Sequence, residues 1–147
     1  MIKKMDHIGI AVRNMDENLN LFETVLGLKA SMIKTSPELG VKLAFVPMGN
    51  GEIEFVEPLG LEGDLAKFME KRGKGMHLHH LCLEVDDVER ELQSLDKKGI
   101  KLVDKKGKQG LAGKVGFLHP HALGGLWVEL VQKKIPANQS MAGIMTG

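Results

Sequence analysis

The sequence predicts an α+β fold made of two tandem modules, each with the element order βαβββ. The first observation is an internal repeat, because D-H-I-G-I-A-V at 6–12 returns as H-H-L-C-L-E-V at 79–85, an offset of 73 (79 − 6). The second is that each copy ends in a strand-like run with an embedded carboxylate, I-E-F-V at 53–56 and V-E-L-V at 128–131. Neither four-stranded sheet can cover its own apolar face alone, so we expect the modules to pack together.

The composition is typical of a soluble globular protein. Of 147 residues, 43% are hydrophobic and 27% are charged, and the scattered basic and acidic residues nearly balance at a net charge of +1. This mixture argues against a nucleic-acid or membrane partner. No apolar stretch approaches the ~20 residues of a membrane span, and none precedes the first predicted strand as a signal peptide would. We expect one cytoplasmic domain covering 1–147, with the single cysteine, Cys82, buried as a small apolar residue.

The first module is expected to begin with a short strand and to continue into a helix. Asn14 and Asp16 are suitable helix-capping residues, and Gly27 is typical of the position just after a helix ends. The predicted bounds are 5–58 for the module, 8–12 for its first strand, and 29–34, 41–47 and 52–57 for the later strands.

A linker with a short amphipathic helix joins the modules. Leu65, Phe68 and Met69 form the predicted apolar stripe of this helix. In the second module, Asp86 and Asp87 are capping candidates and Gly99 matches Gly27. The predicted bounds are 59–75 for the linker, 76–132 for the module, 80–85, 100–103, 115–118 and 126–132 for its strands, 105–113 for an exposed loop and 133–147 for a flexible tail.

The repeat places one histidine and one glutamate at equivalent positions of each half. His7 lies 47 positions before Glu54, and His80 lies 49 positions before Glu129. An unpaired buried carboxylate costs several kcal/mol, although alternation along a strand could also put both glutamates on a solvated face. Two imidazoles and two carboxylates suit a divalent Co, Ni, Zn or Mn ion and leave positions for water or substrate. The sequence therefore predicts a metal site with these four ligands.

Several stretches between Asp6 and Gln132 are more specific than the repeat. They are P-E-L-G-V at 37–41, E-P-L at 57–59, A-K-F-M-E-K-R-G-K-G at 66–75, F-L-H-P at 117–120 and G-G-L-W-V-E-L at 124–130. With the repeat, they make the chain resemble the vicinal oxygen chelate superfamily, and within it the methylmalonyl-CoA epimerase family. The resemblance implies the glyoxalase fold, an eight-stranded, incompletely closed barrel with a metal in its cup, and often a homodimer.

Position by position, the resemblance carries metal-ligand roles onto His7, Glu54, His80 and Glu129, with cobalt as the expected ion. Relatives usually pass from a glycine through one apolar residue into paired histidines, whereas this chain reads G-M-H-L-H-H at 75–80. Two residues therefore look inserted. The match to His7 favours His80 as the ligand, with His77 and His79 as the alternatives if the register shifts.

The resemblance also implies interconversion of (R)- and (S)-methylmalonyl-CoA through abstraction of the α-proton and a metal-stabilised enolate. Glu129 is expected to transfer a proton as well as to bind the metal. Some relatives carry a second glutamate where this chain has Leu43 or Lys42. Lys42, Glu38 or a metal-bound water could replace it, and the sequence does not choose among them.

The CoA phosphates of this substrate need cationic partners. Runs of basic residues are more often solvated surface, so direct contact with CoA is the weaker interpretation. The basic candidates are Lys71, Arg72, Lys74, Lys105, Lys106, Lys108 and Lys114.

The histidine of F-L-H-P, His119, has two possible roles. It either reaches a cleft or stabilises a turn.

Three other functions use the same fold. A glyoxalase I-type lyase (lactoylglutathione lyase) uses the same ligand types, but the linker and F-L-H-P argue against it. Extradiol dioxygenases normally use two histidines and one glutamate, which would leave Glu54 without a role. A metal-free small-molecule-binding module would not need the four ligands at all.

Overall fold

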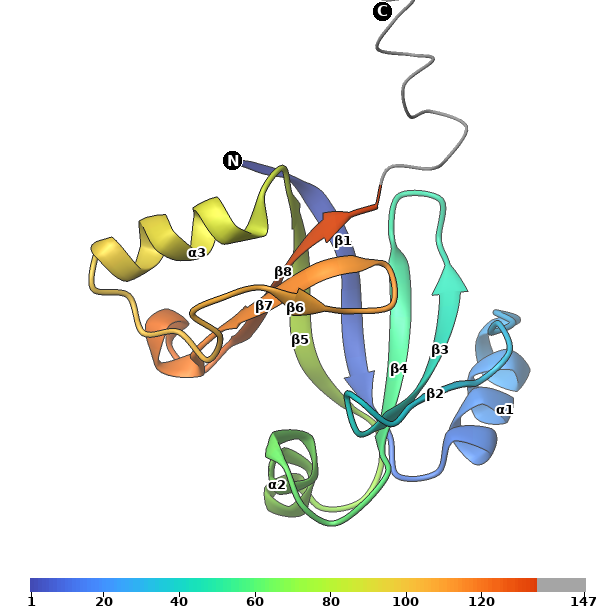
Figure 1. The fold of residues 1–147 in the computed structure, drawn as a ribbon. Coiled ribbons are helices and arrows are strands. Elements are labelled where there is room, and N and C mark those ends of the chain that lie inside the picture. Colours follow the sequence, from blue (N-terminus) through green and yellow to red (C-terminus); the bar gives the residue numbers. More distant parts are fainter. Residues whose placement is uncertain (135–147) are drawn as a thin grey trace, which may run out of the picture.

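The computed structural model describes residues 1–134, which form one eight-stranded mixed sheet with three α-helices (Figure 1). The first module contains, in order, β1 (Ile2–Ala11), α1 (Met15–Leu26), β2 (Lys34–Ser36), β3 (Val41–Pro47) and β4 (Glu52–Pro58). Helix α2 (Asp64–Arg72) lies in the linker. None of the helices in the described residues has the length and apolar character needed to cross a membrane.

The second module repeats the element order of the first. It contains β5 (His77–Val85), α3 (Val88–Lys97), β6 (Lys108–Gln109), β7 (Gly113–Leu118) and β8 (Trp127–Lys133), with a 3-10 turn η1 (Pro120–Leu123) before β8. The predicted α+β class and the paired βαβββ order are therefore confirmed. Strand β8 continues one residue into the segment predicted as a tail, and the rest of that tail, 135–147, lies outside the described residues.

The strand order, β2-β3-β4-β1-β5-β8-β7-β6, is symmetric about its centre. Strands β1 and β5 pair antiparallel there, and each pairs parallel with the last strand of its own module, β1 with β4 and β5 with β8. The sheet curves into a half barrel whose edges are β2 and β6 (Figure 1). The two copies of the sequence repeat thus lie side by side on the symmetry axis.

The helix ends follow the capping chemistry of the sequence. The side chain of Asn14 accepts the backbone N–H of Glu17 at 3.0 Å, and α1 ends at Gly27 in the left-handed conformation, with φ 69°. In the second module, Asp87 accepts the backbone N–H of Arg90 at 3.1 Å. The predicted caps Asn14 and Asp87 are confirmed, whereas Asp16 lies inside the first turn of α1.

The strand predicted at 29–34 is wrong, because only its last residue belongs to β2. Ser31 is the point where this segment meets β3. Its backbone N–H donates to the Phe45 carbonyl at 2.8 Å, and its hydroxyl accepts the Phe45 N–H at 3.0 Å. The Ser31 hydroxyl thus replaces the Ser31 carbonyl as the acceptor of the Phe45 N–H, and the strand pairing does not continue past this residue.

The strand predicted at 100–103 is also wrong. Only Leu102 makes a bridge, to Leu118. The N–H groups of Val103 and Asp104 both donate to the Phe117 carbonyl, at 3.0 and 3.2 Å, so the chain turns instead of pairing residue by residue. The corresponding strand is β6, which lies inside the segment predicted as a loop.

Alternation along the strands separates two faces of the sheet. On the convex face, α1 packs on Ile53 and Phe55, and α3 packs on Leu83, Val128 and Leu130. Side chains one position away therefore point into the concave face, and these include both glutamates of the repeat. The alternative in which Glu54 and Glu129 lie on an open, solvated face does not hold.

Helix α2 lies at one end of the half barrel (Figure 1). Phe68 and Met69 from its predicted apolar stripe are buried against the first module. Arg13 follows β1 and donates to the carbonyls of Met69 and Gly73, at 2.9 and 3.1 Å. Because these carbonyls have no partner inside the helix, the arginine fixes the C-terminal end of α2 to the sheet.

Candidate metal centre

Two neighbouring rows of the sheet bring the repeat's histidines and glutamates together. In one row, Gly9 pairs with Glu54 on one side and with His80 on the other. In the next row on the same face, Cys82 pairs with His7 and with Glu129. The rows are related by the repeat, since Gly9 and Cys82 are 73 positions apart (82 − 9). The four predicted ligands therefore come from the four central strands.

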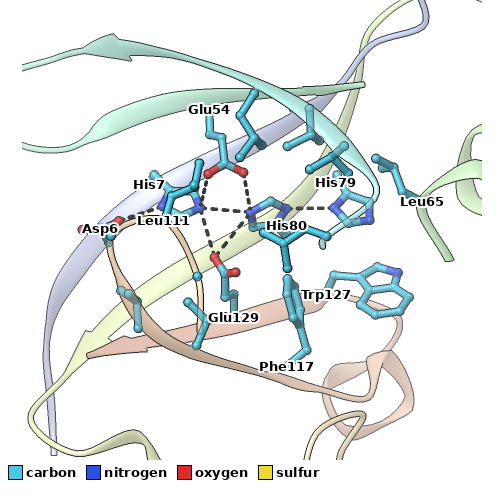
Figure 2. A pocket seen from close by; sticks show the side chains of 18 of the residues that line it. Asp6, His7, Glu54, Leu65, His79, His80, Leu111, Phe117, Trp127 and Glu129 are labelled. Carbon is cyan, nitrogen blue, oxygen red and sulfur yellow. Dashed lines mark hydrogen bonds and ion pairs between the residues drawn. The ribbon is translucent and has the colours of Figure 1, made fainter. Parts of the chain in front are cut away.

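Their donor atoms converge on one point (Figure 2). The Nε2 atom of His7 lies 3.0 Å from Nε2 of His80, 3.5 Å from Oε2 of Glu54 and 3.2 Å from Oε1 of Glu129. The Nε2 atom of His80 lies 3.6 Å from Oε1 of Glu54 and 3.8 Å from Oε1 of Glu129. This set of two imidazole nitrogens and two carboxylates is one that binds divalent ions of the first transition row.

Each histidine is also held at its other ring nitrogen. Nδ1 of His7 lies 2.7 Å from Oδ2 of Asp6, whose second oxygen accepts from Nζ of Lys133 at 2.8 Å. Nδ1 of His80 lies 2.8 Å from Nδ1 of His79. Sequence reasoning missed these partners, although D-H and H-H open the two copies of the repeat. Lys133 has no signal in the sequence, because its position depends on where β8 ends.

The pKa shifts favour a positively charged His7 at the centre of the cluster. Burial lowers the pKa of His7, but hydrogen bonds to Asp6 and Glu129 outweigh burial and raise it to about 10. Burial raises the pKa of Asp6, yet hydrogen bonds from His7 and Lys133 bring it down to about 2. Burial also raises the pKa of Glu129, and the hydrogen bond from His7 with the charges of the histidines lowers it overall. Burial raises the pKa of Glu54 to about 7.

The pKa values of His79 and His80 shift downward, opposite to that of His7. Burial and the charge of His7 lower the pKa of His80 to about 4, although Glu129 opposes them. Burial and the charge of His80 lower the pKa of His79 to about 3. In the metal-free protein, the positive charge between the two glutamates is therefore that of protonated His7. A divalent ion held by these four residues would take the place of that proton, since a histidine must be deprotonated to bind a metal.

Gly9 is required by the packing of His80. A Cβ atom at this position would lie 2.0 Å from Cε1 of the His80 ring, far inside van der Waals contact. Any side chain here would push the imidazole out of the cluster. The matching residue of the repeat, Cys82, is fully buried with a free thiol beside His7, so its predicted burial is confirmed.

The cluster opens into a cavity of about 490 Å³. Its walls are mostly apolar side chains from both modules, and Leu43 is one of them. Lys42 and Glu38 do not line the cavity, and Nζ of Lys42 instead lies 3.7 Å from Oε2 of Glu57. Of the basic candidates for CoA contact, Lys108 lines the cavity, and Lys34 joins it from the opposite edge strand.

Two other candidate histidines lie apart from the cluster. His77 begins β5 and does not line the cavity. His119 caps the turn η1, where its Nδ1 atom accepts the N–H of His121 at 3.1 Å. The turn-stabilising interpretation of His119 therefore agrees with its contacts.

Comparisons with known proteins identify the family. Residues 6–117 match the family model of the Glyoxalase/Bleomycin resistance protein/Dioxygenase superfamily. The mitochondrial methylmalonyl-CoA epimerase of Dictyostelium discoideum is 36% identical over 133 residues, which are 90% of this chain and 80% of that protein. The chain belongs to the methylmalonyl-CoA epimerase family of this superfamily.

Further members of the epimerase family agree. The mitochondrial methylmalonyl-CoA epimerase of Homo sapiens is 37% identical over 130 residues, covering 88% of this chain and 73% of that protein. The crystal structure of methylmalonyl-CoA epimerase from Mycobacterium tuberculosis superimposes with a TM-score of 0.82 at 27% identity, over 95% of this chain and 93% of that one. The predicted family and the half-barrel fold are both confirmed.

Proposed function

We propose that this chain epimerises methylmalonyl-CoA with one divalent metal ion held by His7, Glu54, His80 and Glu129. The observation that carries the proposal is the convergence of these donors in a cavity, His7 Nε2 being within 3.5 Å of an atom of each of the other three. The matched relatives are named methylmalonyl-CoA epimerases, which favours this reaction over that of a glyoxalase I-type lyase.

Glu129 is the proton-transfer group in this proposal. The reaction removes the proton from the carbon between a thioester and a carboxylate and returns a proton to the other face. A bound divalent ion supplies Lewis acidity toward the negative charge that develops on the substrate oxygens. Oε1 of Glu129 faces both imidazoles, at 3.2 Å from His7 and 3.8 Å from His80, which leaves Oε2 to accept the α-proton. Its lowered pKa keeps it ionised for that step.

The second proton comes from water in this proposal. Of the three candidates, Lys42 and Glu38 do not line the cavity, which leaves a metal-bound water. Leu43, at the position where some relatives carry a glutamate, presents an apolar side chain to the cavity. For the CoA phosphates, Lys108 and Lys34 supply positive charge from the two edges of the half barrel. Lys108 is already neutralised in part by Asp104, at 3.4 Å, so phosphate would compete with that carboxylate.

Three finer proposals accompany the reaction. Cobalt is the proposed ion, since mixed imidazole and carboxylate donors suit it along with zinc, nickel and manganese. We also propose a homodimer, as the family resemblance implies. The proposed compartment is the cytoplasm, in keeping with a single free cysteine.

Offering the metal-loaded protein two substrates separates the rival functions. We expect it to epimerise methylmalonyl-CoA and to leave the methylglyoxal–glutathione hemithioacetal at the background rate of the chelator-treated protein. Chiral analysis of the CoA ester and absorbance of the lactoylglutathione product measure the two reactions. Turnover of the hemithioacetal alone would replace the proposal with a lyase. Inactivity toward both would favour a binding module.

A further inference from the structure

The sequence repeat extends to the residues that support the histidines. Asp6 precedes His7, and His79 precedes His80, again 73 positions apart (79 − 6). Each supports its neighbour in the same way, through Nδ1: Asp6 at 2.7 Å in the first module and His79 at 2.8 Å in the second (Figure 2). The positions are equivalent, but one carries a carboxylate and the other an imidazole.

A metal ion at the cluster determines where the protons of these rings lie. A neutral His80 that gives its Nε2 lone pair to a metal carries its proton on Nδ1. At 2.8 Å, that N–H can only donate to Nδ1 of His79, so this nitrogen of His79 carries no proton. His79 is then a neutral ring with its proton on Nε2. Asp6 needs no such arrangement, because an ionised carboxylate only accepts.

Aromatic contacts fix the orientation of the His79 ring. The ring stacks on Trp127 with centroids 5.6 Å apart and planes at 20°, and it meets Phe68 edge to face at 4.6 Å and 88°. The Arg72 guanidinium lies 3.8 Å from the centroid of Phe68. Nε2 of His79 is buried and has no hydrogen-bond partner among the described residues. Within residues 1–134, the contact with His80 is thus the one hydrogen bond of this side chain.

We propose that His79 is a positioning residue whose Nδ1 accepts the Nδ1–H of His80, fixing the tautomer and the orientation that direct His80 Nε2 into the metal centre. The proposal rests on the proposed function, because it requires His80 as a ligand. It makes the two histidine ligands unequal: His7 is supported by an anion paired with Lys133, and His80 by a neutral ring held between aromatic residues.

Two substitutions distinguish the hydrogen bond from packing. His79→Leu removes the acceptor, and we expect zinc affinity to fall by about 10- to 100-fold, as for other partners of metal-bound histidines. His79→Asn retains an acceptor, since the side chain of Asp6 reaches Nδ1 of its neighbouring histidine from the equivalent position. Zinc affinity of His79→Asn should stay close to the wild-type value. Competition with a chromophoric chelator measures both, and thermal unfolding of the metal-free proteins checks that they fold.

The zinc affinities of these variants distinguish an error in the metal site from an error in the role of His79. Unchanged zinc affinity in His80→Ala would overturn both the metal site and the role of His79. Weakened binding in His80→Ala with unchanged binding in His79→Leu, or equal weakening in His79→Leu and His79→Asn, would overturn the role of His79 alone. If His79→Leu does not fold, nitrogen-15 NMR of the zinc-loaded wild type decides. The proposal requires the His79 proton on Nε2 and the His80 proton on Nδ1, and a proton on Nδ1 of His79 would overturn it.

Discussion

Replacing Glu129 with glutamine should lower the rate of α-proton exchange by about 10²- to 10⁴-fold, the range that a positioned general base contributes. Glutamine keeps an oxygen at the metal centre, but it cannot accept a proton. Of the two glutamates at the centre, Glu129 is the one whose pKa is lowered, because the hydrogen bond from His7 and the charges of the histidines oppose the effect of burial, so it is ionised at neutral pH. Incorporation of deuterium into methylmalonyl-CoA in deuterated water measures this step.

Glu84→Gln is the matched control for this variant. Glu84 is also a buried glutamate, and it lies four positions after His80 on the same strand face, but its partner is Lys4 at 3.7 Å and it does not line the cavity. Deuterium incorporation by Glu84→Gln should match the wild type. Equal rates in Glu129→Gln and Glu84→Gln, at full metal content, would remove Glu129 from the proton transfer.

Replacing His80 with alanine should weaken metal binding by at least about 100-fold, since loss of a ligand costs no less than loss of a residue that supports one. His80 is 6% exposed and contributes one of the two nitrogens at the centre. Epimerisation should fall with the metal. Metal analysis after dialysis and chiral analysis of the product measure the two losses.

His119→Ala controls for removal of an imidazole as such. His119 lies outside the cavity and stabilises the turn η1, so its loss should leave the metal content unchanged. Stoichiometric metal in dialysed His80→Ala would show that the ion binds elsewhere.

The repeat carried most of the information needed to predict the site. A histidine and a glutamate at matched positions of two βαβββ modules converge only if the modules pair through their first strands, and β1 and β5 do. Strand alternation then places all four side chains on the concave face. Gly9 was visible in the sequence as part of the first copy, but its function depends on the position of the His80 ring across the strand pair.

Other features depend on contacts that no local pattern contains. The segments 29–33 and 100–103 are apolar enough to be strands, yet the Ser31 hydroxyl and the Phe117 carbonyl replace the ladders that strands would form. Lys133 reaches Asp6 only because β8 extends as far as Lys133 itself, which pairs with Gly113 of β7. The second proton-transfer group could not be predicted, because Lys42 and Glu38 do not line the cavity, whose shape the sequence does not reveal.

Stepwise addition of cobalt to the metal-free protein tests whether His7, Glu54, His80 and Glu129 hold the metal ion of the reaction. The four donors form one centre per chain, so the epimerisation rate of methylmalonyl-CoA should rise linearly and stop rising at about one equivalent of cobalt per chain. Full epimerisation by the metal-free protein in the presence of a strong chelator would contradict the assignment of this cluster as the metal centre of the reaction.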